Sequence, residues 1–146
     1  MISKTVLLLS EPFGEGLDAG RVAAAIARGM EADGLLKCDL CPIEAGLGKS
    51  TRGASKPLDE RDFDRRMRAA RALVIARKRL DDRTLPGSVA FEAATRARQG
   101  GVPAYAVTGH DELDPFEARI IDLQVILEAH TARALSSSGR KLAKLA

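Results

Sequence analysis

Aromatic side chains are scarce in this sequence: they make up 3% of its 146 residues, with one Tyr and no Trp. Proteins that bind single-stranded nucleic acid by base stacking need several exposed aromatic rings. We therefore expect no nucleic-acid partner and a core built from Val, Ile, Leu and Ala. The net charge of +3 is mild, although the Arg residues between positions 61 and 83 cluster and leave room for a small acidic ligand.

Cysteine and histidine are also scarce, with two residues of each. One C-x-x-C pair, Cys38 and Cys41, without a neighbouring His does not make a zinc site. A redox-active pair opens a helix, whereas residues 38–43 alternate like a strand, so we interpret both as ordinary strand thiols. His110 has no second His or Cys near it in the sequence, and His130 is expected at a loop or helix boundary, so we predict no metal site.

Long hydrophobic runs are absent as well. The apolar run near the N-terminus covers residues 6–9, which is too short for a signal sequence or a membrane span. We expect a cytoplasmic protein with reduced thiols and no membrane partner.

Short apolar runs alternate with segments of helical periodicity along the whole chain. This alternation predicts a parallel sheet with helices on both faces and right-handed connections. The length favours one domain, residues 1–146. We predict an α/β fold of three layers, Rossmann-like or flavodoxin-like, with five parallel strands in the order 2-1-3-4-5. The expected strands are residues 5–10, 38–43, 73–76, 102–107 and 123–127, and the expected helices begin near Asp18, Asp59, Pro86, Asp114 and Thr131.

Two stretches are expected to be weakly ordered. Residues 44–58 are rich in Gly, Ser and Lys and should form the longest and most flexible loop. Within it, residues 46–51 (GLGKST) resemble half of a phosphate-binding P-loop, but Ile43 stands where the full motif needs Gly. We therefore interpret this segment as a surface loop that carries a Lys. The Ser-Ser-Ser-Gly stretch at residues 136–139 is expected to weaken the last helix.

A ligand site is expected where the strand order reverses, between the first and third strands. The carboxyl ends of these strands lead into residues 10–16 and 77–84, and the loop at residues 108–111 should flank them. A strand, a polar loop and a helix start in this arrangement are typical of anion and phosphate sites.

Structural alternatives for the same residues stay open. The Arg-Lys-Arg run at residues 77–79 can be a solvated charge run that pairs with Asp81 and Asp82. Thr84 can cap the helix that follows, and Asp81 can pair with Arg79.

Two blocks of the sequence resemble bacterial glycerate kinases. Residues 5–43 resemble the family's first strand, loop and helix, and residues 71–145 resemble a signature loop followed by the last strands. The residues that carry the resemblance are Phe13, Leu17, Ala19, Val22, Ala23, Ala25, Ile26, Gly29, the Arg79-Leu80-Asp81 run with Thr84 and Gly87, residues 101–109, Ile121 and Asp122.

The resemblance implies a Rossmann-like domain and an enzyme that phosphorylates glycerate with ATP and Mg²⁺. Full-length relatives carry a second, inserted domain, which is missing here because only residues 44–70 separate the two blocks. Glu11 and Gly14 replace the family's Asp and Lys, residues 76–78 (Ala-Arg-Lys) replace its Gly-Glu-Gly, and Ser88 replaces a Lys. Phosphoryl transfer needs positive charge and metal ligands around the phosphates, so these departures argue against kinase activity.

The sequence thus predicts a minimal glycerate kinase-like protein that keeps a site for a small anionic metabolite or a nucleotide. A non-catalytic module that acts through self-association or a protein partner is the alternative. A further one is an active phosphotransferase completed by the second copy of a homodimer. The predicted catalytic residues are Arg79 and Asp81, and the predicted ligand-binding residues are Ser10, Glu11, Phe13, Gly14, Gly16, Thr84, Gly87 and Gly109.

Overall fold

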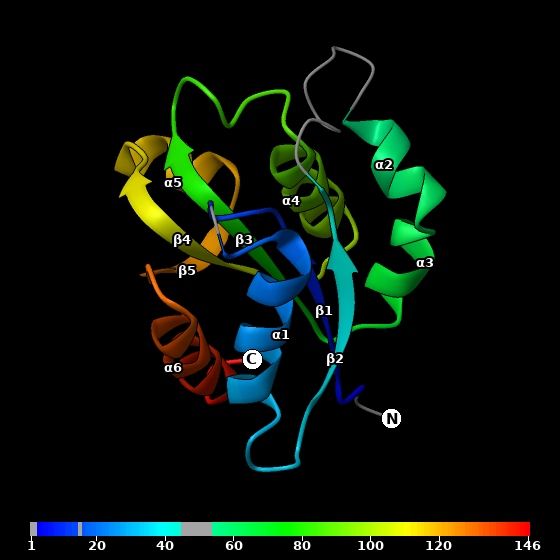
Figure 1. Ribbon diagram of the computed structural model, residues 1–146. Helices are drawn as coiled ribbons and strands as arrows, with labels where there is room; N and C mark the ends of the chain where they lie inside the picture. The colour runs from blue at the N-terminus through cyan, green and yellow to red at the C-terminus, as the bar shows by residue number, and fades with distance from the viewer. Residues whose placement is uncertain (1–2, 15, 45–53) are drawn as a thin grey trace.

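Five parallel strands form one sheet with the order β2-β1-β3-β4-β5, which confirms the predicted α/β architecture. The computed structural model describes residues 3–14, 16–44 and 54–146. The sheet is the middle of three layers, with α1 and α6 on one face and α2, α3 and α4 on the other (Figure 1). The elements are β1 (Thr5–Ser10), α1 (Ala19–Met30), β2 (Lys37–Pro42), α2 (Ser55–Glu60), α3 (Phe63–Arg68), β3 (Ala72–Asp81), α4 (Val89–Gln99), β4 (Ala104–Glu112), α5 (Pro115–Ile120), β5 (Leu123–Glu128) and α6 (Ala132–Ala143).

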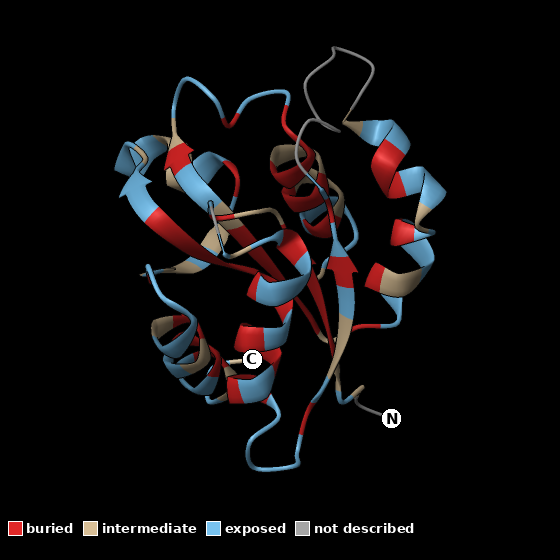
Figure 2. Ribbon diagram, in the orientation of Figure 1, coloured by how far each residue is buried: buried red, intermediate tan, exposed pale blue. Residues whose placement is uncertain are grey.

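The side chains of the central strands alternate between two aliphatic cores, one under each helical layer. Along β1, Leu7 and Leu9 belong to the core beneath α2, α3 and α4, whereas Val6 and Leu8 belong to the core beneath α1 and α6. All four are fully buried, because helices cover both faces of this strand (Figure 2). The continuous apolar run in the sequence is therefore a strand buried on both sides, as predicted.

Helices α1 and α6 pack against each other through small residues. A Cβ atom on Gly29 would lie 1.8 Å from the carbonyl oxygen of Ser136, and one on Gly139 would lie 2.2 Å from that of Ile26. The Ser136 hydroxyl donates to the carbonyl of Ala25 at 2.7 Å. The Ser-Ser-Ser-Gly stretch was expected to weaken the last helix, but α6 is continuous across it. Its small side chains let the two backbones touch.

The opposite layer contains two short helices where one was predicted. Asp62, with a left-handed φ of 56°, separates α2 from α3, and Asp59 lies in the last turn of α2 rather than at a helix start. Helix α2 begins at Ser55, so the end of the predicted 44–58 loop is helical. The P-loop-like residues 46–51 lie outside the described residues.

Ion pairs tie this layer together. Arg96 of α4 places Nη1 2.9 Å from Asp59 Oδ1 and 3.1 Å from Asp64 Oδ1, and its Nε lies 3.1 Å from Glu92 Oε1. The Arg96 side chain is only 14% exposed. One guanidinium therefore links α2, α3 and α4.

Two strands run further than predicted. Residues 77–81 of β3 pair with residues 108–112 of β4. This pairing continues past the end of β1 and, from residue 109 onward, past the end of β5, and we name this extension the β3–β4 ribbon. The predicted loops at residues 77–83 and 108–111 are thus mostly strand. Leu80 explains the extension in part, since it is 1% exposed and belongs to the core beneath α4.

Most helix starts follow their capping residues. Asp18 and Asp114 accept hydrogen bonds from the first turns of α1 and α5, as expected, and Thr131 does the same for α6. For α4 the alternative that Thr84 caps the helix is wrong, because Ser88 caps it, with the Phe91 N–H 3.1 Å from the Ser88 hydroxyl oxygen. No described helix has the length and apolar character needed to cross a membrane.

Candidate functional site

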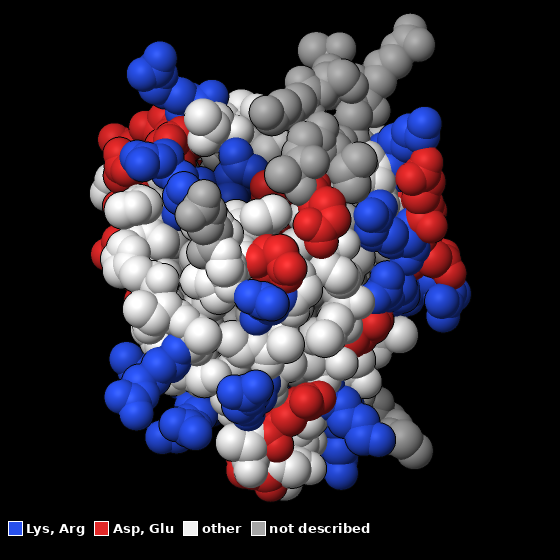
Figure 3. All heavy atoms as spheres, viewed as in Figure 1, with Lys and Arg blue, Asp and Glu red and all other residues white. Residues whose placement is uncertain are grey.

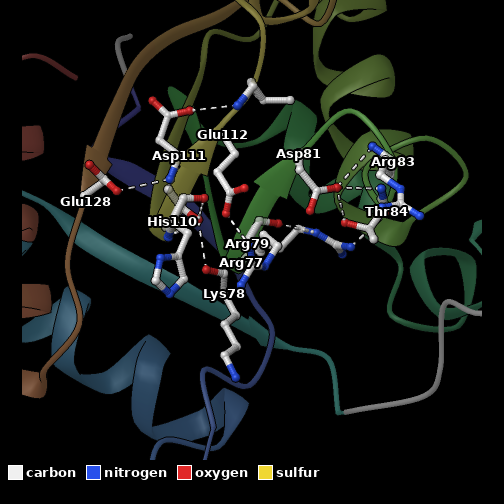
Figure 4. A network of polar contacts seen from close by, with 12 residues as sticks. Arg77, Lys78, Arg79, Asp81, Arg83, Thr84, His110, Asp111, Glu112 and Glu128 are labelled. Atoms are coloured by element: carbon white, nitrogen blue, oxygen red, sulfur yellow. Dashed lines mark hydrogen bonds and ion pairs between the residues drawn. The ribbon is translucent and has the colours of Figure 1, made fainter.

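The carboxyl edge of the sheet carries the residues that the sequence singles out. After β1 the chain crosses to α1 on one face of the sheet, and after β3 it crosses to α4 on the other face. The two connections therefore diverge at the edge between these strands. The N–H of Glu11 still donates to the Ala76 carbonyl at 2.9 Å, and beyond this bond the β3–β4 ribbon continues alone. We call the surface formed by the described residues of the 11–17 loop and by the ribbon the switch-point surface (Figure 4).

Arg77 fastens the segments of this surface to one another. Its Nη1 lies 3.0 Å from both carboxylate oxygens of Glu11, its Nε donates to the Arg79 carbonyl at 3.0 Å, and its Nη2 donates to the Thr84 carbonyl at 3.1 Å. The Arg77 and Glu11 side chains are 16% and 22% exposed. The alternative of a solvated charge run is therefore wrong for Arg77, because a carboxylate distant in the sequence reaches it.

Arg79 and Asp81, the predicted catalytic residues, stabilise the ribbon and its exit turn. Arg79 forms an exposed ion pair with Glu112 across the ribbon, so the alternative that it pairs with Asp81 is wrong. Asp81 Oδ1 accepts from the hydroxyl and the N–H of Thr84, both at 2.7 Å, and from the N–H of Arg83 at 3.1 Å. These bonds, that of the Thr84 hydroxyl first, lower the pKa of Asp81 from its ordinary value.

The loop after β1 is anchored by buried residues and presents glycine on its outside. Ser10 is fully buried and its hydroxyl donates to the Ala19 carbonyl at 2.7 Å, while Phe13 packs into the core beneath α1. Gly14 and Gly16 are exposed and have φ values of 135° and 78°, which favour glycine. Ser10 and Phe13 therefore position the loop, and the two glycines face outward.

The other predicted ligand-binding glycines have structural tasks. Gly87 has a φ of 77° and turns the chain into the Ser88 cap. Gly109 lies inside β4 rather than in a loop, and a Cβ atom on it would lie 2.9 Å from the Lys78 carbonyl oxygen. Only glycine lets the two strands of the ribbon approach so closely at this point.

A cluster of basic side chains at the same surface was missed by the sequence reasoning. The Nζ of Lys78 lies 3.9 Å from the position of a Cβ atom on Gly14, so this exposed side chain reaches the β1 loop. The rings of His110 and His130 meet edge to face, with centroids 5.2 Å apart. In Figure 4 the side chains of Lys78 and His110 point to the same side of the ribbon.

His110 has no second His near it in the sequence, but the fold brings His130 beside it. The pairing of β4 with β5 places His130, which follows β5, beside His110. The alternation of side chains along a strand could have indicated this, because it places Lys78 on the face of the strand opposite to Arg77 and Arg79. It could be used only if residues 77–81 were known to form a strand, and their charged composition predicted a loop instead.

The described residues do not fit the magnesium and ATP site that the glycerate kinase resemblance implies. In the part of the chain that the structure describes, no group of three or more His, Cys, Asp or Glu could hold a metal ion. The carboxylates of the switch-point surface are engaged within the protein, Glu11 by Arg77 and Glu112 by Arg79. Magnesium needs oxygen ligands that remain free to coordinate it.

The two cysteines do not form a redox pair. Both are free thiols, and they lie on opposite faces of β2, Cys38 toward α1 and Cys41 in the other core. Burial, with a smaller contribution from Glu31, raises the pKa of Cys38 to about 12. Burial also raises the pKa of Cys41. A reactive thiol requires the opposite shift, so the interpretation as ordinary strand thiols agrees with this geometry.

Comparisons with known proteins support the fold of this chain but do not assign it to a family. No protein-family model and no curated protein matches the chain. A solved structure of an oxidoreductase from Corynebacterium diphtheriae is similar, with 13% identity, a TM-score of 0.55, and coverage of 99% of this chain and 97% of that chain. The glutaminase domain of CTPS from Trypanosoma brucei with bound acivicin has 11% identity, a TM-score of 0.42, and coverage of 73% and 36%. The first likeness shows the same kind of α/β fold over the whole chain.

Proposed function

We propose that this protein binds a small organic anion, a carboxylate or phosphate ester of about the size of glycerate, at the switch-point surface. It would be a glycerate kinase-like protein that does not transfer phosphate. The proposal rests on the position of this surface, since ligands of open α/β sheets bind outside the carboxyl ends of the strands where the strand order reverses.

The observation that carries the proposal is the position of the Lys78 ammonium. It is exposed, it lies against the Gly14 turn, and no ion pair joins it to a carboxylate among the described residues. Arg77 and Arg79 beside it are both paired. An exposed ammonium next to a glycine turn gives an anion both a charge and close access to the backbone.

The engaged carboxylates support the part of the proposal that excludes phosphoryl transfer. In phosphoryl transfer, metal ions and positive side chains neutralise the charge that develops on the transferred group. Glu11 is held by Arg77 with two contacts of 3.0 Å, and this pair would have to open before the carboxylate could meet a metal. This arrangement favours a binding role over a kinase role.

Thermal shift and calorimetry with glycerate, inorganic phosphate and ATP test the proposal. A ligand that binds the folded chain raises its unfolding midpoint. We expect glycerate or phosphate to raise the midpoint at about 1 mM or higher, and Lys78→Ala to abolish the shift. Lys37→Ala is the matched control, because it removes the same charge from an exposed position at the amino end of β2.

Several results would contradict the proposal. Equal shifts in Lys78→Ala and the wild type would show that the ligand binds elsewhere. Turnover of ATP with glycerate would contradict the non-catalytic part. No shift with any ligand, together with a dimer in light scattering, would favour the alternative of a self-associating module.

A further inference from the structure

Helices α1 and α6 form a face whose charges all have one sign. α1 contains Arg21 and Arg28, α6 contains Arg133, Arg140 and Lys141, and neither helix contains an Asp or Glu. These two helices thus carry five cationic residues, although the net charge of the whole chain is only +3. Lys and Arg atoms gather over α6 and the end of α1 at the lower left of Figure 3.

A hollow of about 430 Å³ lies between the two helices on this face. Its lining consists of Arg28 from α1 and of Ala132, Arg133, Ser136 and Arg140 from α6. The small residues lie between the charged ones, and the Ser136 hydroxyl is bonded to the Ala25 carbonyl of α1. The base of the hollow is therefore formed by small side chains, with Ser136 held in place by its hydrogen bond, and guanidinium groups surround it.

The contact of the helix backbones sets the spacing of these groups. A Cβ atom on Gly29, the neighbour of Arg28, would lie 3.0 Å from the Arg140 backbone nitrogen, so the two arginines start from adjacent points on facing helices. Arg133 and Arg140 are seven residues apart, which is about 10 Å along a helix and nearly the same angular position. The three side chains therefore surround one space.

None of these guanidinium groups is neutralised within the described part of the chain. Ion pairs are formed there by Arg65, Arg66, Arg77, Arg79 and Arg96, but by none of the three arginines of the hollow. Grouping unpaired arginines raises their mutual repulsion, which an anion relieves. Guanidinium groups stay charged at all physiological pH values and bind phosphate oxygens in pairs.

We propose that this hollow binds a small molecule with several phosphate groups. The volume accommodates a compact molecule, and the spread of the three arginines requires more than one anionic group to reach them all. An extended nucleic acid fits less well, because the lining contains no aromatic side chain for base stacking. The lining of this site comes from α1 and α6, and it shares no residue with the switch-point surface.

Calorimetric titration with inorganic tripolyphosphate at about 50 mM salt tests this site. Arg133→Ala and Arg140→Ala should each weaken binding by about tenfold or more, and Arg140→Lys should also weaken it because an ammonium cannot form the paired contact. Lys141→Ala is the matched control: it removes a charge from the next residue of α6, which does not line the hollow, and should change the affinity by less than about twofold.

The same titration separates this proposal from the previous one. Lys78→Ala should bind tripolyphosphate as the wild type does, whereas the hollow variants should keep their response to glycerate. The unfolding midpoints should match, since the altered side chains are exposed.

Three results would overturn the proposal. The first is no heat of binding at about 1 mM tripolyphosphate. The second is an equal loss of affinity in Lys141→Ala. The third is tighter binding of a short DNA duplex or of phosphatidylserine vesicles, lost in the same arginine variants, which would assign the face to a macromolecular polyanion.

Discussion

The helices of the two layers are held to their neighbours in different ways. On one face, α1 and α6 touch through backbone atoms at Gly29 and Gly139, and their outer surface carries only positive charges. On the other face, α2, α3 and α4 are held by large buried side chains such as Phe63 and by the ion pairs of Arg96. The first layer is therefore sensitive to added atoms, and the second to removed ones.

This difference teaches where each layer can change. A glycine contact depends on the absence of a side chain, so almost any substitution there separates the helices. A contact made by large side chains tolerates swaps of similar volume and fails when a cavity is left. The substitutions below test each half of this contrast.

The largest effect is expected from removing a large side chain in the second layer. Phe63 is 1% exposed, and Phe63→Ala should lower the free energy of unfolding by about 4 kcal/mol through the lost burial and the cavity. Phe116→Ala is the matched control, because that side chain is 65% exposed and its loss should change stability by less than about 0.5 kcal/mol. Urea unfolding monitored by circular dichroism measures both variants. Similar losses of stability in Phe63→Ala and Phe116→Ala would contradict the idea that large buried side chains hold this layer.

The next effect comes from adding one carbon atom to the first layer. Gly139→Ala places a Cβ atom 2.2 Å from the Ile26 carbonyl oxygen, and should cost about 3 kcal/mol despite the better helix propensity of Ala. Gly20→Ala in α1 is the control, since its Cβ atom would meet only Asp18 Oδ1 at 3.6 Å. That variant should be neutral or more stable by up to about 1 kcal/mol. A Gly139→Ala protein as stable as the wild type would disprove the close contact.

A smaller effect is expected at the ion pairs of the second layer. Arg96→Ala should lower stability by about 1–2 kcal/mol, because Asp59, Asp64 and Glu92 lose their shared partner. Arg133, on the first layer, forms no ion pair with any residue that the structure describes, so Arg133→Ala should change stability by less than about 0.5 kcal/mol. Thermal unfolding at low and high salt checks this: the deficit of Arg96→Ala should shrink as salt screens the pairs.

The smallest effect concerns thiol reactivity, which reports on each layer separately. In the native protein both cysteines should react slowly with iodoacetamide at pH 8, since burial raises the pKa of both from their ordinary value of 9.0. Gly139→Ala should speed labelling of Cys38, and Phe63→Ala should speed labelling of Cys41. Mass spectrometry of labelled peptides distinguishes the two, and equal acceleration of both thiols in either variant would show that the layers open together.

The sequence predicts the sheet well because its central strands are specified locally. The run at residues 6–9 is apolar at every position, as a strand covered on both faces requires. The β3–β4 ribbon was not predicted, because residues 77–79 are charged and a strand of such residues depends on partners far away in the sequence. The ion pairs of Arg77 with Glu11 and of Arg79 with Glu112 are those partners.

The sequence predicted the position of the candidate site in the fold better than it predicted the residues that form its surface. The reversal of the strand order located the edge of the sheet, but Ser10 and Phe13 proved to be buried within it. Lys78 and the two histidines come together only through the pairing of β3, β4 and β5. Close contacts such as that of Gly29 with Ser136 depend on how two helices cross, and no local pattern specifies that.

The β3–β4 ribbon also has a consequence for how copies of this protein meet one another. Past the ends of β1 and β5, the described sheet continues as two strands with open edges, and open edges are templates for edge-to-edge aggregation. Lys78, Arg79, Asp111 and Glu112 surround these edges with charge of both signs. A strand of another molecule that paired there would have to displace the water around these charged groups. The charged residues that made the ribbon hard to predict from the sequence therefore also protect it against aggregation.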